Sequence, residues 1–251
     1  MQTLILSPRH SSDTQALWQA LIKRDDWKAH RAYRYQVPGD VENPCVYGEM
    51  QFCDIIASEL GLQLLEPPDH FLEGLPIEFT KRRVELRVHS SLWQYKERKF
   101  IKPANDKVFV AGVYERGGHV PHKHILPSCP VIVSDVVEFE VEYRCYVLDR
   151  KVVTLSCYEW VGMMHQENPD HRGEVQEFMG DLLKLPDLCL PSACVVDVGL
   201  IPGEGWAVIE ANQAYASGIY HEAEVSALLP LLARASGRNP LPDDLKFVRP
   251  L

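Results

Sequence analysis

Residues 195–220 read VVDVGLIPGEGWAVIEANQAYASGIY, and the reversal at PGEG, residues 202–205, organises the whole stretch. The glycines give this turn the backbone freedom that a tight reversal needs. Pairing the flanking segments symmetrically about the turn places Asp197 directly opposite Glu210. Asn212 lies two residues further along and shares their face, because side chains alternate along a strand. The sequence therefore predicts a hairpin that gathers three oxygen-bearing side chains at the end away from its turn.

The opposite face of this hairpin is predicted to be apolar throughout, formed by Val196, Val198, Leu200, Ala207, Ile209 and Ala211. Two carboxylates that face each other across a sheet repel, and a divalent cation would remove that cost. Mg²⁺ prefers oxygen ligands and takes one or two carboxylates together with substrate phosphates. We therefore interpret Asp197, Glu210 and Asn212 as a Mg²⁺ site, with Mn²⁺ as the alternative ion. The competing interpretation is that both carboxylates simply point into solvent.

Another hairpin is predicted around a turn at Asp149 and Arg150. Symmetric pairing about that turn places Arg144 opposite Leu155. Arg144 then shares one face with a mostly acidic set of residues, Glu138, Glu140, Glu142, Cys157 and Glu159. The other face is largely apolar, as in a sheet that is buried on one side. An arginine among several carboxylates is more than a solvated face requires, so we predict a functional role for Arg144.

The rest of the chain is predicted to combine strands and helices. The expected strands are at residues 3–6, 31–37, 100–103, 108–114 and 131–133, and the expected helices run from 12 or 13 to 23, over 51–60 and over 78–93. The early strand–helix alternation indicates a small α/β unit. The basic residues of the helix predicted over 78–93 are expected to form a solvated face.

The composition excludes several classes of protein. The 251 residues are 46% hydrophobic and 24% charged, which is the balance of a folded globular chain rather than a disordered one. The net charge of −9 argues against a nucleic-acid partner. No apolar run reaches the ~20 residues that span a bilayer, so no membrane partner is expected. Seven cysteines without a Cys-x-x-Cys pair, and no secretory signal, lead us to expect reduced thiols and a cytoplasmic location.

Common catalytic motifs are missing from the sequence. There is no Gly-x-x-x-x-Gly-Lys-Ser/Thr loop, no Gly-x-Gly-x-x-Gly and no Gly-x-Ser-x-Gly elbow. A histidine-rich stretch offers one competing site, because His119, His122 and His124 together with Cys129 could bind zinc. The neighbouring glycines and Pro121 indicate a loop, and no second pair of ligands follows, so we favour a surface loop.

Three segments carry a resemblance to a known family: FIKPANDKVF (100–109), EYRCYV (142–147) and IEANQAYASGIY (209–220). In this order they resemble ATP-grasp proteins, and most of all the divergent clade with an arginine-and-lysine signature. That clade includes the assembly chaperone of eukaryotic translation initiation factor two. The resemblance implies an α+β ATP-grasp fold, in which two α+β lobes grip a nucleotide. It divides the chain into an N-terminal α/β subdomain at 1–75, a first lobe at 76–133, and a second lobe with the metal hairpin at 134–251.

The resemblance also implies a role for each site residue. Lys102 and Lys107 would contact the phosphates of ATP, Arg144 would stabilise a phosphate or acyl-phosphate, and the hairpin would hold Mg²⁺. The connection between the lobes would bind adenine and ribose through Val133, Ser134, Asp135, Val136, Val137 and Glu138. Many clade members have arginine where this chain has Lys102. The usual glycine-rich phosphate loop is also missing, and Gly117-Gly118 is its nearest candidate.

The function implied is an ATP- and Mg²⁺-dependent carboxylate–amine ligase. ATP would phosphorylate a carboxylate, and an amine would then attack the acyl-phosphate, giving a peptide-like bond, ADP and phosphate. Lys102 and Arg144 would be the catalytic residues, and the acid and amine are expected to be either small molecules or protein groups. The alternative is an ATP-binding assembly chaperone, or a protein-binding module, with little turnover.

Overall fold

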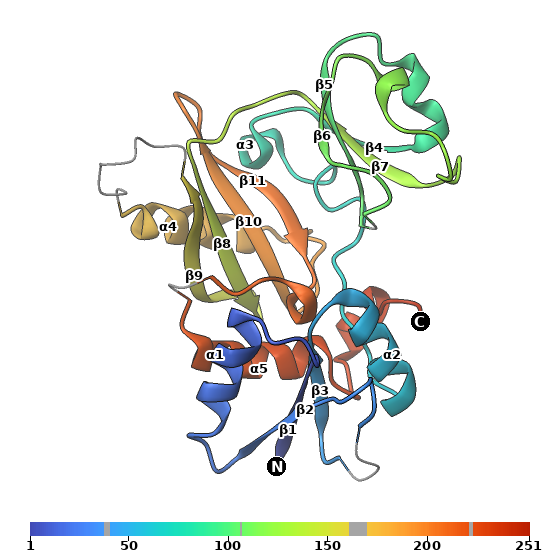
Figure 1. Ribbon diagram of the computed structural model, residues 1–251. Coiled ribbons are helices and arrows are strands. Elements are labelled where there is room, and N and C mark those ends of the chain that lie inside the picture. Colours follow the sequence, from blue (N-terminus) through green and yellow to red (C-terminus); the bar gives the residue numbers. More distant parts are fainter. Residues whose placement is uncertain (38–40, 106, 161–169, 221–222) are drawn as a thin grey trace.

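The computed structural model describes residues 1–37, 41–105, 107–160, 170–220 and 223–251, and it contains three sheets (Figure 1). The N-terminal sheet is parallel, in the order β2-β1-β3, with strands β1 Gln2–Leu6, β2 Trp27–Arg31 and β3 Pro44–Tyr47. Helix α1 Ser12–Leu21 and helix α2 Met50–Leu60 accompany it. The helix predicted over 51–60 is confirmed, and Gly61 ends it with a left-handed φ of 65°. The strand predicted at 31–37 is wrong, because β2 ends where that segment begins.

The first-lobe sheet is antiparallel, in the order β4-β7-β5-β6. Its strands are β4 Val84–Val88, β5 Lys99–Pro103, β6 Gly112–Tyr114 and β7 Pro130–Ser134. The short helices η1 His89–Gln94 and η2 Gly117–His119 cover one face of this sheet, above a small core that includes Leu92, Ile101 and Val133.

The helix predicted over 78–93 is wrong. Helix α3, Ile77–Thr80, ends at Lys81, which has a left-handed φ of 51°, and the chain then enters β4. Val84 and Leu86 pack on the core between the lobes, whereas the charged residues alternating with them lie on the other face. This period of two, rather than a helical period, governs the segment because the backbone of β4 pairs with β7 while Val84 and Leu86 pack against the core between the lobes.

The second-lobe sheet is antiparallel, in the order β11-β10-β8-β9. Its strands are β8 Val141–Leu148, β9 Lys151–Trp160, β10 Ala193–Ile201 and β11 Gly205–Asn212. Helix α4, Arg172–Leu183, packs against it, and η3 Ala214–Ala216 follows β11. Helix α5, Val225–Ala235, shares the core of the N-terminal sheet, and η4 Pro242–Phe247 lies near the end of the chain. No helix among the described residues is long and apolar enough to cross a membrane.

Both hairpins form, but with shifted registers. In the β10–β11 hairpin, Asp197 faces Glu210 as predicted, and a β-bulge then pairs Val198 with Val208. Trp206 and Val208 therefore enter the core shared with α4, whereas Ile209 is only half-buried; Ala207 is buried as well.

In the β8–β9 hairpin, the turn at Asp149 and Arg150 is confirmed, and both residues have positive φ. A register shift between Tyr146 and Val147 then places Arg144 opposite Ser156, so the predicted pairing with Leu155 is wrong, and a further shift follows between Glu142 and Tyr143. The predicted faces of β9 change accordingly, because a one-residue slip exchanges the two faces of a strand.

Candidate functional site

The two lobes meet at an ion pair between Lys102 and Glu210. Lys102 comes from β5 of the first lobe and Glu210 from β11 of the second, and the lysine Nζ donates to the carboxylate Oε2. The side chains are only 16% and 29% exposed. Lys102 therefore already neutralises one of the two carboxylates among the three predicted metal ligands.

Arg144 and Asp197 form the other ion pair of the site, on neighbouring strands β8 and β10. Arg144 donates from Nε at 2.9 Å and from Nη2 at 2.7 Å to the two oxygens of Asp197, and from Nη1 at 3.2 Å to the carbonyl of Gly218. Asp197 is 1% exposed. This bidentate contact is the strongest hydrogen-bonding arrangement that an arginine makes with a carboxylate.

Asn212 joins the two pairs. Its Nδ2 donates to Glu210 Oε1 at 2.7 Å and lies 3.5 Å from Asp197 Oδ2. The structure thus brings the three predicted metal ligands together with Lys102 and Arg144. Two cations and two carboxylates make this cluster electrically neutral.

The donor set fits a hard divalent cation, because two carboxylates and an amide supply oxygen ligands. In the structure these oxygens face Lys102, Arg144 and the Asn212 amide instead. If the two carboxylates held Mg²⁺ instead, Lys102 and Arg144 would be free to contact phosphate oxygens. No group of three or more His, Cys, Asp or Glu residues within the described ranges is placed to bind a metal, so the amide of Asn212 is needed.

Burial and neighbouring charges shift the pKa values of these side chains in opposite directions. Burial raises the pKa of Glu210, but Lys102 outweighs it and holds that pKa below its usual value. Burial disfavours the charged guanidinium of Arg144, yet its hydrogen bonds to Asp197 raise its pKa. For Asp197, which is almost completely enclosed, burial dominates and raises the pKa against the opposing pull of Arg144.

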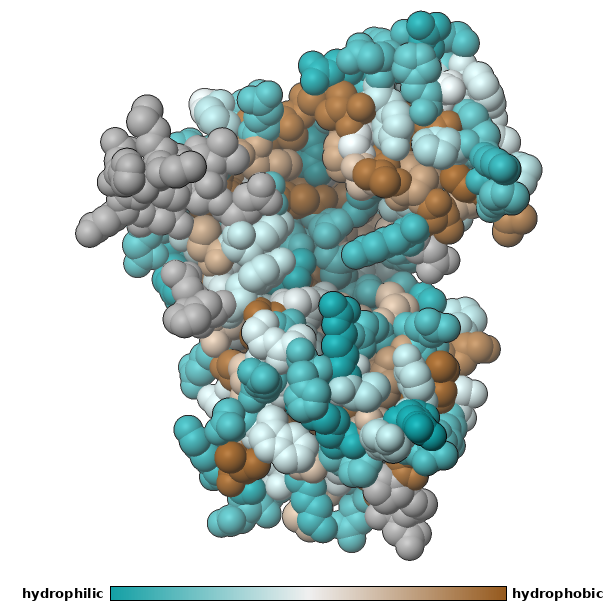
Figure 2. All heavy atoms as spheres, viewed as in Figure 1, coloured by the Kyte–Doolittle hydropathy of each residue, from teal (hydrophilic) through white to brown (hydrophobic). Residues whose placement is uncertain are grey.

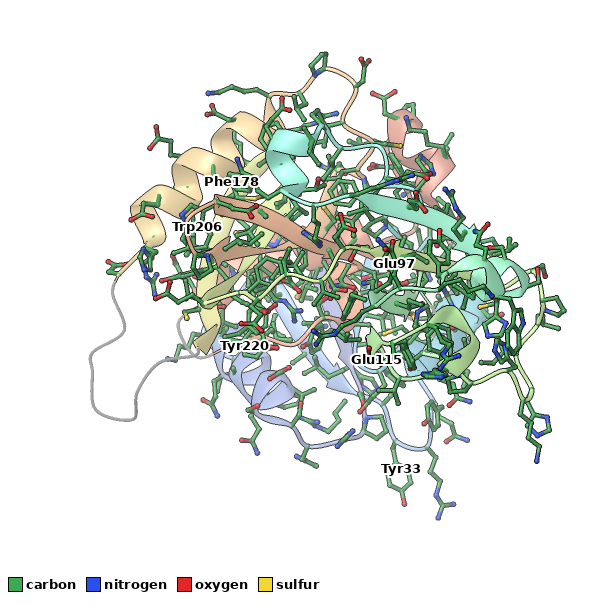
Figure 3. The ribbon with its side chains drawn as sticks, turned by 90° about the horizontal axis from the view of Figure 1, so that it is seen from above. Tyr33, Glu97, Glu115, Phe178, Trp206 and Tyr220 are labelled. Atoms are coloured by element: carbon green, nitrogen blue, oxygen red, sulfur yellow. The ribbon has the colours of Figure 1, made fainter. Side chains whose placement is uncertain are left out.

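Two tyrosines complete the surroundings of Arg144. The rings of Tyr158 and Tyr220 stack with centroids 5.0 Å apart, and the guanidinium carbon of Arg144 lies 5.4 Å and 5.1 Å from them. Figure 3 shows Tyr220 beside the second-lobe sheet, near the N-terminal unit. The sequence could not place Tyr158 here, because only the register shifts in β9 bring it to the face of Arg144.

Comparison with known proteins identifies the family. A family model described as an ATP-grasp domain, family 2 of the arginine-and-lysine (R-two-K) clade, matches residues 79–228, which is more than half of the chain. The chain belongs to this ATP-grasp clade. The α+β ATP-grasp fold predicted from the sequence is confirmed. No curated protein gives a significant match to the sequence.

Solved ATP-grasp structures share the architecture. The RimK domain protein ATP-grasp from Sphaerobacter thermophilus DSM 20745 is 16% identical, with a TM-score of 0.51 over 84% of this chain and 91% of that one. The D-alanine–D-alanine ligase from Bacillus anthracis, solved with ATP, is 10% identical, with a TM-score of 0.50 over 94% and 96% of the two chains. At these identities the likeness concerns the ATP-grasp fold alone.

The ATP-grasp lobes are joined by residues 135–140, which follow β7. Val133 and Ser134 are buried at the end of β7. Asp135 accepts from Lys99 Nζ at 2.9 Å and from the Arg83 backbone at 3.2 Å, and Lys99 keeps the pKa of Asp135 low.

Three further predicted nucleotide-binding residues lie in or near this part of the ATP-grasp fold. Val136 and Val137 are half-buried, and Glu138 is exposed. Lys107 is exposed between β5 and β6 and makes no hydrogen bond or ion pair with the described residues of the cluster. The roles of all these residues in nucleotide binding remain predictions.

A charged cavity of about 380 Å³ opens on the first ATP-grasp lobe. Its lining is Arg83, Glu85, Arg87, Gln94, Tyr95, Glu97, Lys99, Val133, Ser134 and Asp135. Lys102 pairs with Ile132, which packs between the lobes, whereas Val133 packs beneath η1. The cavity therefore lies on the opposite face of the sheet from Lys102. Figure 2 shows hydrophilic side chains along the recess between the first lobe and the N-terminal unit.

The histidine-rich loop lies within the described residues, and no three of its histidine and cysteine side chains are placed to bind a metal. His122 stacks on Trp93 with ring centroids 4.5 Å apart and meets the edge of His89 at 4.7 Å. The neighbouring glycines are explained by packing. A Cβ on Gly117 would lie 1.8 Å from the carbonyl oxygen of Leu92, and one on Gly118 would lie 2.6 Å from the ring of Trp93.

Proposed function

We propose that this protein is an ATP- and Mg²⁺-dependent carboxylate–amine ligase that works through an acyl-phosphate. One observation carries the proposal: in a chain of this ATP-grasp clade, Lys102 of the first lobe pairs with Glu210 of the second, and Asn212 links Glu210 to the Arg144–Asp197 pair. Phosphoryl transfer depends on charge neutralisation and positioning more than on covalent help from the protein. The cluster supplies both.

Each residue of the cluster has a distinct role in this proposal. Asp197, Glu210 and Asn212 would hold Mg²⁺, or alternatively Mn²⁺, which would supply positive charge to neutralise the phosphates. Lys102 provides a compact positive charge for the phosphates. Arg144 provides a planar fork for the transferred phosphoryl group or the acyl-phosphate. Tyr158 and Tyr220 keep that fork in place.

The reaction proceeds in two balanced steps. A carboxylate oxygen of the acid attacks the γ-phosphorus of ATP, the bond to the β–γ bridging oxygen breaks, and ADP leaves. The amine then attacks the acyl carbon, a C–N bond forms, phosphate leaves with the electron pair of the broken C–O bond, and the amine loses a proton. A closed cleft protects the acyl-phosphate from water.

The nucleotide base belongs, in this proposal, at the connection between the lobes. Backbone groups of residues 133–138 would bind adenine, and the carboxylate of Asp135 or Glu138 would bind ribose. Lys107 would approach the phosphates as another cation. The acid and amine substrates are small molecules or groups on a protein, in the cytoplasm.

An assembly chaperone related to that of eukaryotic translation initiation factor two is the alternative function. The ligand-free structure has a cavity of only about 20 Å³ beside the Lys102–Glu210 contact and thus no preformed pocket for an acid and an amine there. A chaperone would use ATP to set the position of the lobes, without a pocket for an acid and an amine.

A turnover assay separates the two functions. ADP release is measured with a library of acids and amines, in parallel with calorimetric binding of Mg-ATP, for the wild type and Lys102→Ala. A ligase releases ADP only with a matching acid, and the variant loses both binding and turnover. Persistent binding without turnover across the library would favour the chaperone. Equal Mg-ATP binding by the variant would contradict both functions.

A further inference from the structure

Arg82 is a buried cation without an ion-pair partner among the described residues. It is 9% exposed and lies between α3 and β4, where the chain enters the first lobe. Its guanidinium donates from Nη1 to the carbonyls of Thr80 at 3.0 Å and Val208 at 2.9 Å, and from Nη2 to the carbonyl of Ile209 at 3.3 Å. Burial lowers the pKa of Arg82 to about 10. A buried charge held only by carbonyls needs an explanation.

The carbonyls that Arg82 binds belong to the β-bulge of β11. This strand is at the edge of its sheet, so the carbonyls on its outer side have no strand partner. The register shift falls directly after the Asp197–Glu210 pair, and Ile209 is the additional residue in β11. Arg82 therefore binds the extra residue of the bulge and the one before it.

The bulge decides which way Glu210 points. In a regular strand Val208 and Glu210 would lie on the same face, because side chains two residues apart do. In the structure Val208 enters the core, while Glu210 turns to Lys102 and Asn212. Because Ile209 is inserted between them, Val208 can be buried in the core while Glu210 points into the cluster.

Packing around Arg82 supports the same arrangement. Its guanidinium carbon lies 5.5 Å from the ring of Phe139, in the connection between the lobes. A Cβ on Gly199 would lie 2.5 Å from Phe139 and 3.0 Å from Ile209, so these groups are in tight contact. The two chain segments that lead into the lobes thus converge on the bulge.

We propose that Arg82 is a positioning residue that holds the β11 bulge and thereby orients Glu210 for Mg²⁺. The inference rests on the proposed Mg-ATP site. The side chain is engaged by carbonyls of β11 and acts on the site through the backbone.

Calorimetry with ATP, with and without Mg²⁺, tests this role in Arg82→Met and Arg82→Lys. Arg83→Met is the matched control, because Arg83 is the next residue and its side chain is 75% exposed and paired with Glu85. We expect Arg82→Met to weaken Mg-ATP binding about tenfold or more, while binding of metal-free ATP changes less than twofold. Arg82→Lys should show the same selective loss to a smaller extent, because one ammonium cannot span three carbonyls. Arg83→Met should bind Mg-ATP within twofold of wild type.

Hydrogen exchange of the ligand-free variants gives a second readout, in which amides of residues 209–211 should exchange faster than in the control. Unchanged Mg-ATP affinity in a folded variant would overturn the inference. An equal loss with and without Mg²⁺ would also overturn it, since Arg82 would then contact the nucleotide or only support the fold. If Arg82→Met does not fold, Arg82→Lys decides by the same criterion. A wild type without Mg²⁺-dependent ATP binding would instead contradict the proposed function.

Discussion

Lys102 and Glu210 are 108 positions apart in the sequence and form an ion pair that joins the two ATP-grasp lobes. Each side chain is less than one-third exposed, and Lys102 holds the pKa of Glu210 below its usual value. In the proposed function Glu210 would hold Mg²⁺ together with Asp197 and Asn212, and Lys102 would be free to contact a phosphate. The ligand-free protein thus keeps its site ordered by pairing the groups that ATP and Mg²⁺ would separate.

Replacing Lys102 should reveal how much the Lys102–Glu210 ion pair contributes to stability. In Lys102→Met, Glu210 stays enclosed without a cation, and we expect the free energy of unfolding to fall by about 1–3 kcal/mol. Urea denaturation measures the change. Lys107→Met is the control, since that lysine is exposed and its loss should change stability by no more than about 0.5 kcal/mol. Equal stability of the two variants would show that the ion pair contributes nothing.

Arg144 and Asp197 should behave as a coupled unit. Arg144→Met leaves an almost fully buried carboxylate unpaired, and we expect a loss of about 3–5 kcal/mol in unfolding free energy. The double variant Arg144→Met with Asp197→Asn should lose less than the sum of the two single variants. A double-mutant cycle from denaturant unfolding measures the coupling. Additive losses would indicate that the two side chains act independently.

The stability that Glu210 contributes should depend on pH. Lys102 holds the folded-state pKa of Glu210 below the value of about 4.3 for an unperturbed glutamate. The contribution is therefore complete above that value and is lost as the pH falls through the lower folded pKa. The stability difference between wild type and Glu210→Gln, measured by urea unfolding, should shrink between pH 6 and pH 3. A difference that grows on acidification would contradict this sign.

The N-terminal unit should support the segment that holds Arg144. Asp13 of α1 accepts from the hydroxyl of Tyr47 at 3.0 Å and from the Ile219 backbone at 3.1 Å. Asp13→Ala removes both acceptor contacts, and we expect a loss of about 1–3 kcal/mol with faster amide exchange at Ile219. Tyr47→Phe removes only the hydroxyl and should leave that amide protected. Unchanged exchange at Ile219 in Asp13→Ala would disprove the link.

The sequence predicts the centre of the site better than its surroundings. The pairing of Asp197 with Glu210 follows from turn geometry, and Asn212 follows from strand alternation. The β-bulges are not predictable in this way, because they depend on which face each strand buries against α4 and the first lobe. Tyr158 and the contact of Arg82 with the β11 bulge were therefore not predicted.

The first lobe shows the same limit for secondary structure. Residues 78–93 contain good helix formers, but Val84 and Leu86 alternate with charged residues, and the segment around them forms β4, which pairs with β7. Helix α5 likewise packs on the sheet at the opposite end of the chain. Contacts between residues far apart in the sequence determine both the strand at β4 and the position of α5, and local sequence patterns do not predict such contacts.

Calorimetric titration of ATP into the wild type and Glu210→Gln, each with and without Mg²⁺, tests the central claim most directly. The claim is that Asp197, Glu210 and Asn212 hold the metal that binds the ATP phosphates. Wild type should bind ATP at least tenfold more tightly with Mg²⁺ than without it, and Glu210→Gln should lose most of that gain. Mg²⁺-dependent binding of equal strength in both proteins, or no effect of Mg²⁺ on the wild type, would contradict the account.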